Sequence, residues 1–337
     1  MEEAMKAGKI AESVLKRSVL RQLHTEPEEV LLGAAVGEDC AAIDLKDQNT
    51  VVLSSDPVFG SLEQPEELAK RVVWKAVNNL ASAGAAPVGI MITVLFPTSA
   101  NEPQLRTLMQ KLSEVCQAQK LAILGGHTEV TRAVNQPVIT VTGVGRTQKD
   151  KLVRTSGVKP GMDIIATNWI ALEGTVRIAN AKEEELRTRY AQPFIDKAKK
   201  LEVYIPILSE AAVACMSGVS AMHDVSEGGI FAALWEMAEA SGVGLEIDLK
   251  KIPLRQETVE ICEFFGINPY KLVSGGCMLM AAADGNAIVR EIEKAGGTAS
   301  IIGKATDSND RVLWNEDERR FLETPQTDEI NKIGELS

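Results

Sequence analysis

Residues 65–96 read PEELAKRVVWKAVNNLASAGAAPVGIMITVLF, and their hydrophobic pattern changes period part of the way along. In the first part the apolar residues recur four apart, which is the spacing of one helix face: Leu68, Val72, Ala76 and Leu80. Pro65 suits the first turn of such a helix, and Gly84 and Pro87 suit its end. The apolar run 88–96 then predicts a strand buried on both faces. A helix followed by a buried strand indicates a layered protein of mixed α and β structure.

The same alternation continues on both sides of this segment. In the first half, strands are predicted at 51–55 and 138–144, and a second helix opens at Pro103. In the second half, helices are predicted at 175–181, 205–216, 228–240, 258–265 and 286–295, and strands at 163–167, 220–223, 244–247, 278–282 and 300–303.

A turn-rich segment, SGVKPG at 156–161, separates the two halves. We therefore expect an α/β (α+β) protein with domains at 1–155 and 156–310 and a polar, loosely ordered tail at 311–337. Strands covered by one helical layer are the expected architecture in both domains.

Composition excludes several classes of protein. The chain has 337 residues and a formal net charge of −11, so general binding to nucleic acid or to anionic membranes is not expected. The apolar runs are too short to span a bilayer, and the charged start shows no signal-peptide core. The five cysteines form no CxxC pair, which argues against a disulfide scaffold or zinc cluster and favours a reducing cytoplasm.

Carboxylates stand at expected strand ends, where α/β proteins hold Mg²⁺ and phosphate. Glu38 and Asp39 precede a small apolar run, Asp56 ends a strand, and Asp224 joins a strand to a helix. Acids from distant segments can together hold a metal–nucleotide complex, since Mg²⁺ prefers a few carboxylates plus phosphate oxygens. Turn formation or helix capping is the alternative for each acid taken singly.

Two glycine-rich segments are candidate phosphate-binding turns. Gly125 and Gly126 follow an apolar run, and Gly228 and Gly229 open an expected helix whose positive end favours an anion. Neither matches a standard phosphate-loop pattern, so an ordinary turn remains the alternative.

The chain has three histidines, and two of them lie beside these segments. His127 follows Gly126, and His223 precedes Asp224. Each is a candidate for general acid–base catalysis or for donation to phosphate, and a satisfied structural histidine is the alternative.

Taken together and in order, five motifs resemble those of the aminoimidazole ribonucleotide (AIR) synthetase superfamily, most of all its HypE-like hydrogenase-maturation branch. They are GEDCAAI at 37–43, VNNLASAGAAP at 77–87, GGHTEV at 125–130, LEGT at 172–175 and HDVSEGG at 223–229. The resemblance covers roughly residues 30 to 305.

The resemblance implies a two-domain fold. The N-terminal domain would form a β-barrel across a homodimer, and the C-terminal domain would be a ferredoxin-like α/β domain. It also implies that ATP and Mg²⁺ bind in a cleft and that the terminal phosphate passes to an oxygen of an amide- or carbonyl-type acceptor, on a small molecule or a protein.

Site residues are carried over from the matching motifs, and Asp56 is added from its place at the end of an expected strand. Glu38, Asp39, Asp56, Asn79 and Asp224 would hold the metal, with Glu38 assisting and Asn79 a weak extra ligand. The phosphates would face Asn78, Gly125, Gly126, His127, Thr128, Gly228 and Gly229. His127 or His223 would move the proton, while catalysis would come mostly from charge neutralisation and alignment.

Three departures from the family pattern keep other functions open. Asn79 and His127 stand where relatives often have a metal-binding aspartate, and imidazole is a poor ligand for Mg²⁺. The last cysteine is Cys277, so the chain as given does not end in the reacting cysteine of the HypE-like branch. A non-catalytic nucleotide-binding scaffold is one alternative, and a kinase or ligase of thiamine phosphate or of a purine precursor is another.

Overall fold

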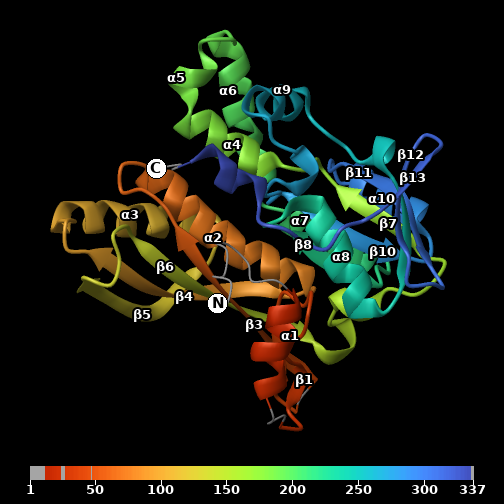
Figure 1. Cartoon of the computed structure of the whole chain (residues 1–337). Helices are drawn as coiled ribbons and strands as arrows, with labels where there is room; N and C mark the ends of the chain where they lie inside the picture. The colour runs from red at the N-terminus through yellow and green to blue at the C-terminus, as the bar shows by residue number, and fades with distance from the viewer. Residues whose placement is uncertain (1–11, 24–26, 47, 335–337) are drawn as a thin grey trace, which may run out of the picture. The chain divides into compact units, whose positions relative to one another are not determined.

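The computed structural model describes residues 12–23, 27–46 and 48–334 (Figure 1). The chain divides into two compact units. The N-terminal unit comprises residues 27–33 and 39–152, and the C-terminal unit comprises residues 34–38 and 153 onward, together with the first described helix.

A six-stranded sheet forms the N-terminal unit, in the order β1-β2-β3-β6-β4-β5. The strands are β1 (Val30–Leu32), β2 (Ala41–Asp44), β3 (Asn49–Phe59), β4 (Ala86–Pro97), β5 (Ala122–Thr131) and β6 (Val138–Gln148). Neighbouring strands are antiparallel except β4 and β5, which are parallel and joined through α3 (Glu102–Ala118). A crossover helix is what a parallel pair requires.

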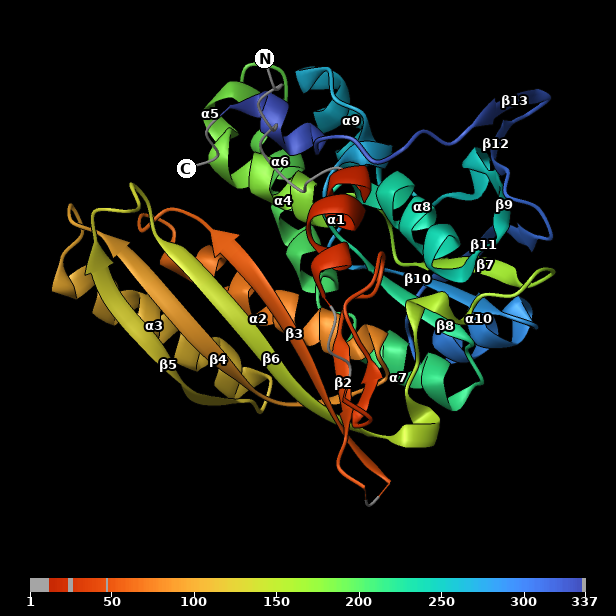
Figure 2. The ribbon, with the colours of Figure 1, turned by 60° about the horizontal axis from the view of Figure 1, so that its bottom comes forward.

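Helices α2 (Pro65–Ser82) and α3 cover one face of this sheet, as Figure 2 shows. Side chains alternate along β4, so that Ile90, Ile92 and Val94 are buried whereas Met91 is 47% exposed. The prediction of a strand buried on both faces is therefore wrong for β4 within this chain. One helical layer lies on this sheet, as expected, and its other face carries no helix in the described part of the unit.

The C-terminal unit contains a seven-stranded sheet in the order β13-β12-β9-β11-β7-β10-β8. Its strands are β7 (Asp163–Thr167), β8 (Ala221–Val225), β9 (Gly244–Asp248), β10 (Cys277–Ala282), β11 (Ala299–Thr306), β12 (Arg311–Asn315) and β13 (Glu318–Phe321). Its helices are α1 (Glu12–Ser18), α4 (Leu172–Ala181), α5 (Glu183–Leu186), α6 (Gln192–Lys200), α7 (Leu208–Met216), α8 (Gly229–Ser241), α9 (Gln256–Phe265) and α10 (Gly285–Lys294).

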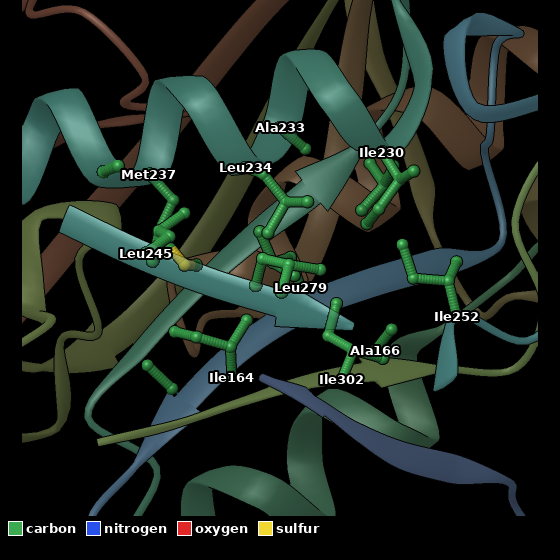
Figure 3. Packing of buried hydrophobic residues seen from close by; sticks show 14 of the residues in the cluster. Ile164, Ala166, Ile230, Ala233, Leu234, Met237, Leu245, Ile252, Leu279 and Ile302 are labelled. Carbon is green, nitrogen blue, oxygen red and sulfur yellow. The ribbon is translucent and has the colours of Figure 1, made fainter. Parts of the chain in front are cut away.

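The main core of this unit lies between α8 and the sheet. Figure 3 shows Leu234 and Met237 of α8 above Ile164, Leu245 and Leu279 of the strands, and all five are buried. Strand β10 is buried along its whole length, although successive side chains of a strand point to opposite faces. Both faces of the sheet are therefore covered at this strand, and α10 contacts β7, β10 and β11. The prediction of a single helical layer is wrong for this domain.

The C-terminal segment differs from the loosely ordered tail expected at 311–337. Residues in it form β12 and β13, and Leu322 packs into the main core. Ile330, in the short helix η7 (Glu329–Ile333), is buried in a second core beneath α4, α6 and α9. The prediction of a loosely ordered tail is therefore wrong. It rested on the average composition of the segment, which hides the few apolar residues that pack against the rest of the unit.

The glycine-rich segment at 125–128 is part of strand β5 and not a turn. A Cβ atom on Gly126 would lie 1.7 Å from the carbonyl oxygen of Ile92, and the φ angle of Gly126 is +147°. Glycine is required here because the two strand backbones approach closely. The hydrophobic pattern did not predict this strand, because glycine has no side chain to contribute to an alternating apolar pattern.

Among the described residues, no helix is both long and apolar enough to cross a membrane.

Candidate functional site

Two of the predicted metal ligands meet in the N-terminal unit. Asp56 comes from β3 and Asn79 from α2, and the Asn79 amide Nδ2 donates a hydrogen bond of 2.6 Å to Asp56 Oδ2. The Lys75 ammonium, one helical turn before Asn79, lies 4.0 Å from Asp56 Oδ1. Residues far apart in the sequence thus form one polar cluster against the inner face of the sheet.

The motif at 37–43 contacts the same cluster through Cys40. The Cys40 thiol donates to the backbone carbonyl of Asn79 at 2.9 Å, and Ser82 donates to the same carbonyl at 2.8 Å. Asp39, the residue before Cys40, is partly buried. The side chains of Asn78 and Asn79 are buried as well. The three segments 39–40, 56 and 78–82 therefore converge, as the resemblance requires. We call Cys40, Asp56, Asn79 and Ser82 the Asp56 cluster.

The Asn79–Asp56 contact explains how an amide at position 79 suits the Asp56 carboxylate. Two ionised carboxylates at this distance would repel each other strongly unless a cation or a shared proton lay between them. Asparagine replaces that repulsion with a charge-assisted hydrogen bond. The asparagine therefore holds the Asp56 carboxylate in place without help from a metal ion.

His127 and its neighbours lie on an exposed edge strand. Gly125, Gly126, His127 and Thr128 are all exposed in β5. The His127 side chain is 64% exposed, and its Nε2 lies 3.3 Å from Glu129 Oε2. His127 is accessible to a ligand, whereas Gly126 beside it is needed for the close pairing of β5 with β4.

Glu38 has a structural partner. Its two carboxylate oxygens accept backbone N–H groups from Thr155 and Ser156, both at 3.1 Å. These residues begin the short helix η3 (Thr155–Gly157), so Glu38 caps it within the C-terminal unit. Capping was the alternative to metal binding that the sequence left open, and the geometry favours it.

His223 and Asp224 are adjacent in β8, so their side chains point to opposite faces of the sheet. His223 is only 2% exposed, and its Nε2 lies 3.0 Å from Glu236 Oε2 of α8. This favours the structural alternative for His223. Asp224 is buried beside Met278 of β10 in the strand register.

Asp328 was not found by sequence reasoning, yet it binds one of the predicted phosphate turns. Its carboxylate accepts the backbone N–H of Gly228 at 2.6 Å, and those of Ile330 at 2.8 Å and Val273 at 3.3 Å. Burial raises the pKa of Asp328 to about 6. The N–H of Gly228 at the start of α8 therefore donates to a carboxylate of the chain itself. A lone aspartate in a polar segment gives no signal for this role.

The predicted metal ligands fall into both units. Asp39, Asp56 and Asn79 belong to the N-terminal unit, and Glu38 and Asp224 to the C-terminal unit. Over the described ranges, no group of three or more His, Cys, Asp and Glu side chains forms a set that could hold a metal ion. One carboxylate and one amide oxygen are nevertheless a donor set that suits Mg²⁺ when phosphate oxygens supply further ligands.

Comparison with known proteins gives consistent matches over nearly the whole chain. A putative hydrogenase expression/formation protein of Methanocaldococcus jannaschii is 26% identical over 333 residues, which is 97% of each chain. The carbamoyl dehydratase HypE of Rhodobacter capsulatus is 25% identical over 86% of this chain and 82% of its own length. A crystal structure of the hydrogenase maturation protein HypE in complex with ATP shares the fold, with a TM-score of 0.65 at 16% identity, and the match covers 97% of this chain and 98% of that one.

Two family descriptions also match, and together they span most of the chain. The N-terminal domain of AIR synthase related protein matches residues 37–147, and the C-terminal domain matches residues 159–315. The first contains the Asp56 cluster, and the second contains β8 and the start of α8. The chain therefore belongs to the AIR synthase-related family, with the mixed α/β two-domain fold of that family.

Proposed function

We propose that this protein is an ATP- and Mg²⁺-dependent enzyme of the HypE-like branch, which transfers the terminal phosphate of ATP to an oxygen of an amide- or carbonyl-type acceptor. The convergence of two motif segments with Asp56 of β3 carries the proposal, because no structural need of a sheet–helix interface calls for a half-buried carboxylate there. A relative named carbamoyl dehydratase and a structural neighbour crystallised with ATP support it.

In this proposal Mg²⁺ would neutralise charge on the phosphates of ATP. Asp39 and Asp56 would hold the ion, and Asp224 is a further candidate ligand. Asn79 would orient Asp56 through its 2.6 Å hydrogen bond. His127, whose side chain is exposed, would move the proton. Asn78, Thr128 and Gly229 remain candidates for contact with phosphate.

Replacement of Asp56 tests the assignment. We expect Asp56→Ala to abolish ATP turnover while circular dichroism shows a folded protein. Asp44→Ala is the matched control, because Asp44 lies in the same sheet and pairs with exposed Lys149 at 2.7 Å, away from the cluster. Full ATP turnover by the Asp56 variant with an accepted substrate would contradict the metal assignment.

We also propose that the uncovered face of the N-terminal sheet pairs with the same face of a second copy, as the family resemblance implies. Phe59, Val138 and Leu95 lie side by side across β3, β6 and β4, and Phe59 is exposed. Burial of this apolar row is favourable. Analytical ultracentrifugation showing a monomer at micromolar concentration would count against the homodimer.

A nucleotide-binding scaffold is the second candidate, and the amide at position 79 favours it. Loss of one carboxylate weakens a metal site, while nucleotide binding needs fewer charged ligands. Calorimetry with ATP and Mg²⁺, followed by a phosphate-release assay with carboxamide acceptors, separates the two functions. Binding without turnover would indicate the scaffold. In either case we place the protein in the cytoplasm, where its free cysteines stay reduced.

A further inference from the structure

One cavity in the C-terminal unit is assigned to no function by the arguments above. It measures about 120 Å³ and lies between the first turn of α8, the helix η6 (Pro269–Lys271) and the C-terminal segment. Its walls include Phe231, Leu313, Phe321 and Pro325. A cavity of about 150 Å³ accepts one benzene molecule, so this space is of the size that takes a single ring.

The apolar walls are flat and held in place. The Phe231 ring stacks on Tyr270 with centroids 5.1 Å apart and an interplanar angle of 13°. In the antiparallel pairing of β13 with β12, Arg320 lies opposite Leu313, so its side chain is on the same face of the sheet as that wall residue. Phe231 is only partly buried, so a ring placed against it would remove apolar surface from water.

The polar part of the cavity is cationic, in a chain of net charge −11. Lys271 and Arg320 face a single carboxylate, Glu323, which pairs with Lys271 at 2.8 Å. Among the residues that the structure describes, Arg320 forms no ion pair. Its guanidinium is therefore available to bind a carboxylate through two parallel hydrogen bonds. The N–H of Gly228 at the start of α8 already donates to Asp328. A negatively charged ligand would therefore pair with Arg320 and Lys271 and not with the N-terminus of α8.

The outer wall of the cavity is a fixed part of the fold. Residues 322–326 follow directly on β13, and the segment is anchored beyond them by Asp328 and by Glu329, which accepts the backbone N–H of Asn268 at 3.2 Å. A preformed site binds without the cost of ordering a loop.

We propose that this cavity binds a small aromatic or heteroaromatic acid, with the ring against Phe231 and the carboxylate on Arg320. The proposal is independent of ATP turnover, because it concerns binding alone and rests on residues of the C-terminal unit.

Calorimetry on the full chain with benzoate, and with benzamide as its uncharged counterpart of the same shape, tests the proposal. We expect benzoate to bind at least about tenfold more tightly than benzamide, the difference that a charge-assisted pair supplies. Arg320→Gln should remove this difference and leave benzamide binding unchanged. Arg290→Gln, at an exposed arginine of α10, is the matched control and should leave the binding of both benzoate and benzamide unchanged.

Two further variants give opposite expectations. Glu323→Gln frees Lys271, so benzoate should bind several-fold more tightly than to the parent chain. Phe231→Leu should weaken benzoate and benzamide alike. Equal binding of the two probes, no binding of either at millimolar concentration, or benzoate binding that survives Arg320→Gln would each overturn the proposal.

Discussion

Replacing Asn79 with aspartate should make the stability of the chain depend on divalent cations. The amide of Asn79 lies 2.6 Å from an Asp56 oxygen, so Asn79→Asp places a second carboxylate against the first. Two unit charges about 4 Å apart repel by about 4 kcal/mol at an effective dielectric constant near 20. The variant also loses a hydrogen bond to a charged group, which contributes about 1.5–3 kcal/mol.

Relaxation and a shared proton relieve part of this cost. The Lys75 ammonium, 4.0 Å from Asp56, screens a further part of the repulsion. We therefore expect a loss of about 2–4 kcal/mol in the free energy of unfolding without metal. A cation present at 100 times its dissociation constant would return about 2.7 kcal/mol.

Thermal unfolding followed by circular dichroism, in EDTA and in MgCl₂ or MnCl₂, measures this effect. We expect Asn79→Asp to unfold several degrees lower than the parent chain in EDTA and to recover with the cation. Asn79→Leu is the control: it loses the same hydrogen bond without adding charge, so its lower melting temperature should not respond to the cation. If Asn79→Asp shows no cation response, or if Asn79→Leu shows the same one, residue 79 does not share a cation with Asp56 and the reasoning fails.

Three more predictions follow from single features of the structure. Gly126→Ala should lower the free energy of unfolding in urea by at least about 3 kcal/mol, because its Cβ would meet the β4 backbone. Gly125→Ala, at a similar φ but with no atom within 4 Å of its Cβ, should lower it by about 1 kcal/mol. Equal losses in the two variants would contradict the pairing of β5 with β4. The pKa of Asp328 is about 6 in the folded chain against about 3.9 when unfolded, so its contribution to stability is full below pH 4 and is lost as the pH rises through 6. The parent chain should therefore lose more stability than Asp328→Asn between pH 4 and 6, and a steeper loss in the variant would refute the burial argument. Thr142→Arg, on the uncovered sheet face beside Met91, should turn a dimer into a monomer in ultracentrifugation, and an unchanged dimer would place the interface elsewhere.

The hydrophobic pattern of the sequence located most regular elements because burial alone imposes it. The prediction of a helix from Pro65 to Gly84 agrees with α2, and the strand predicted at 163–167 agrees with β7. Strand β5 and the C-terminal strands were missed, since glycines and charged residues hide a pattern that only pairing with neighbouring strands enforces.

The motifs by themselves determined the family and the set of candidate residues, because their order along the chain is a property of the sequence. Which of these residues make contact was decided by the tertiary structure. A hydrogen bond between Asn79 and Asp56 depends on how α2 lies on β3, and the role of Glu38 as a cap depends on a helix that begins far along the chain. Gly228 binds Asp328 for the same reason: contact between residues 100 positions apart is fixed by packing, on which local sequence carries no information.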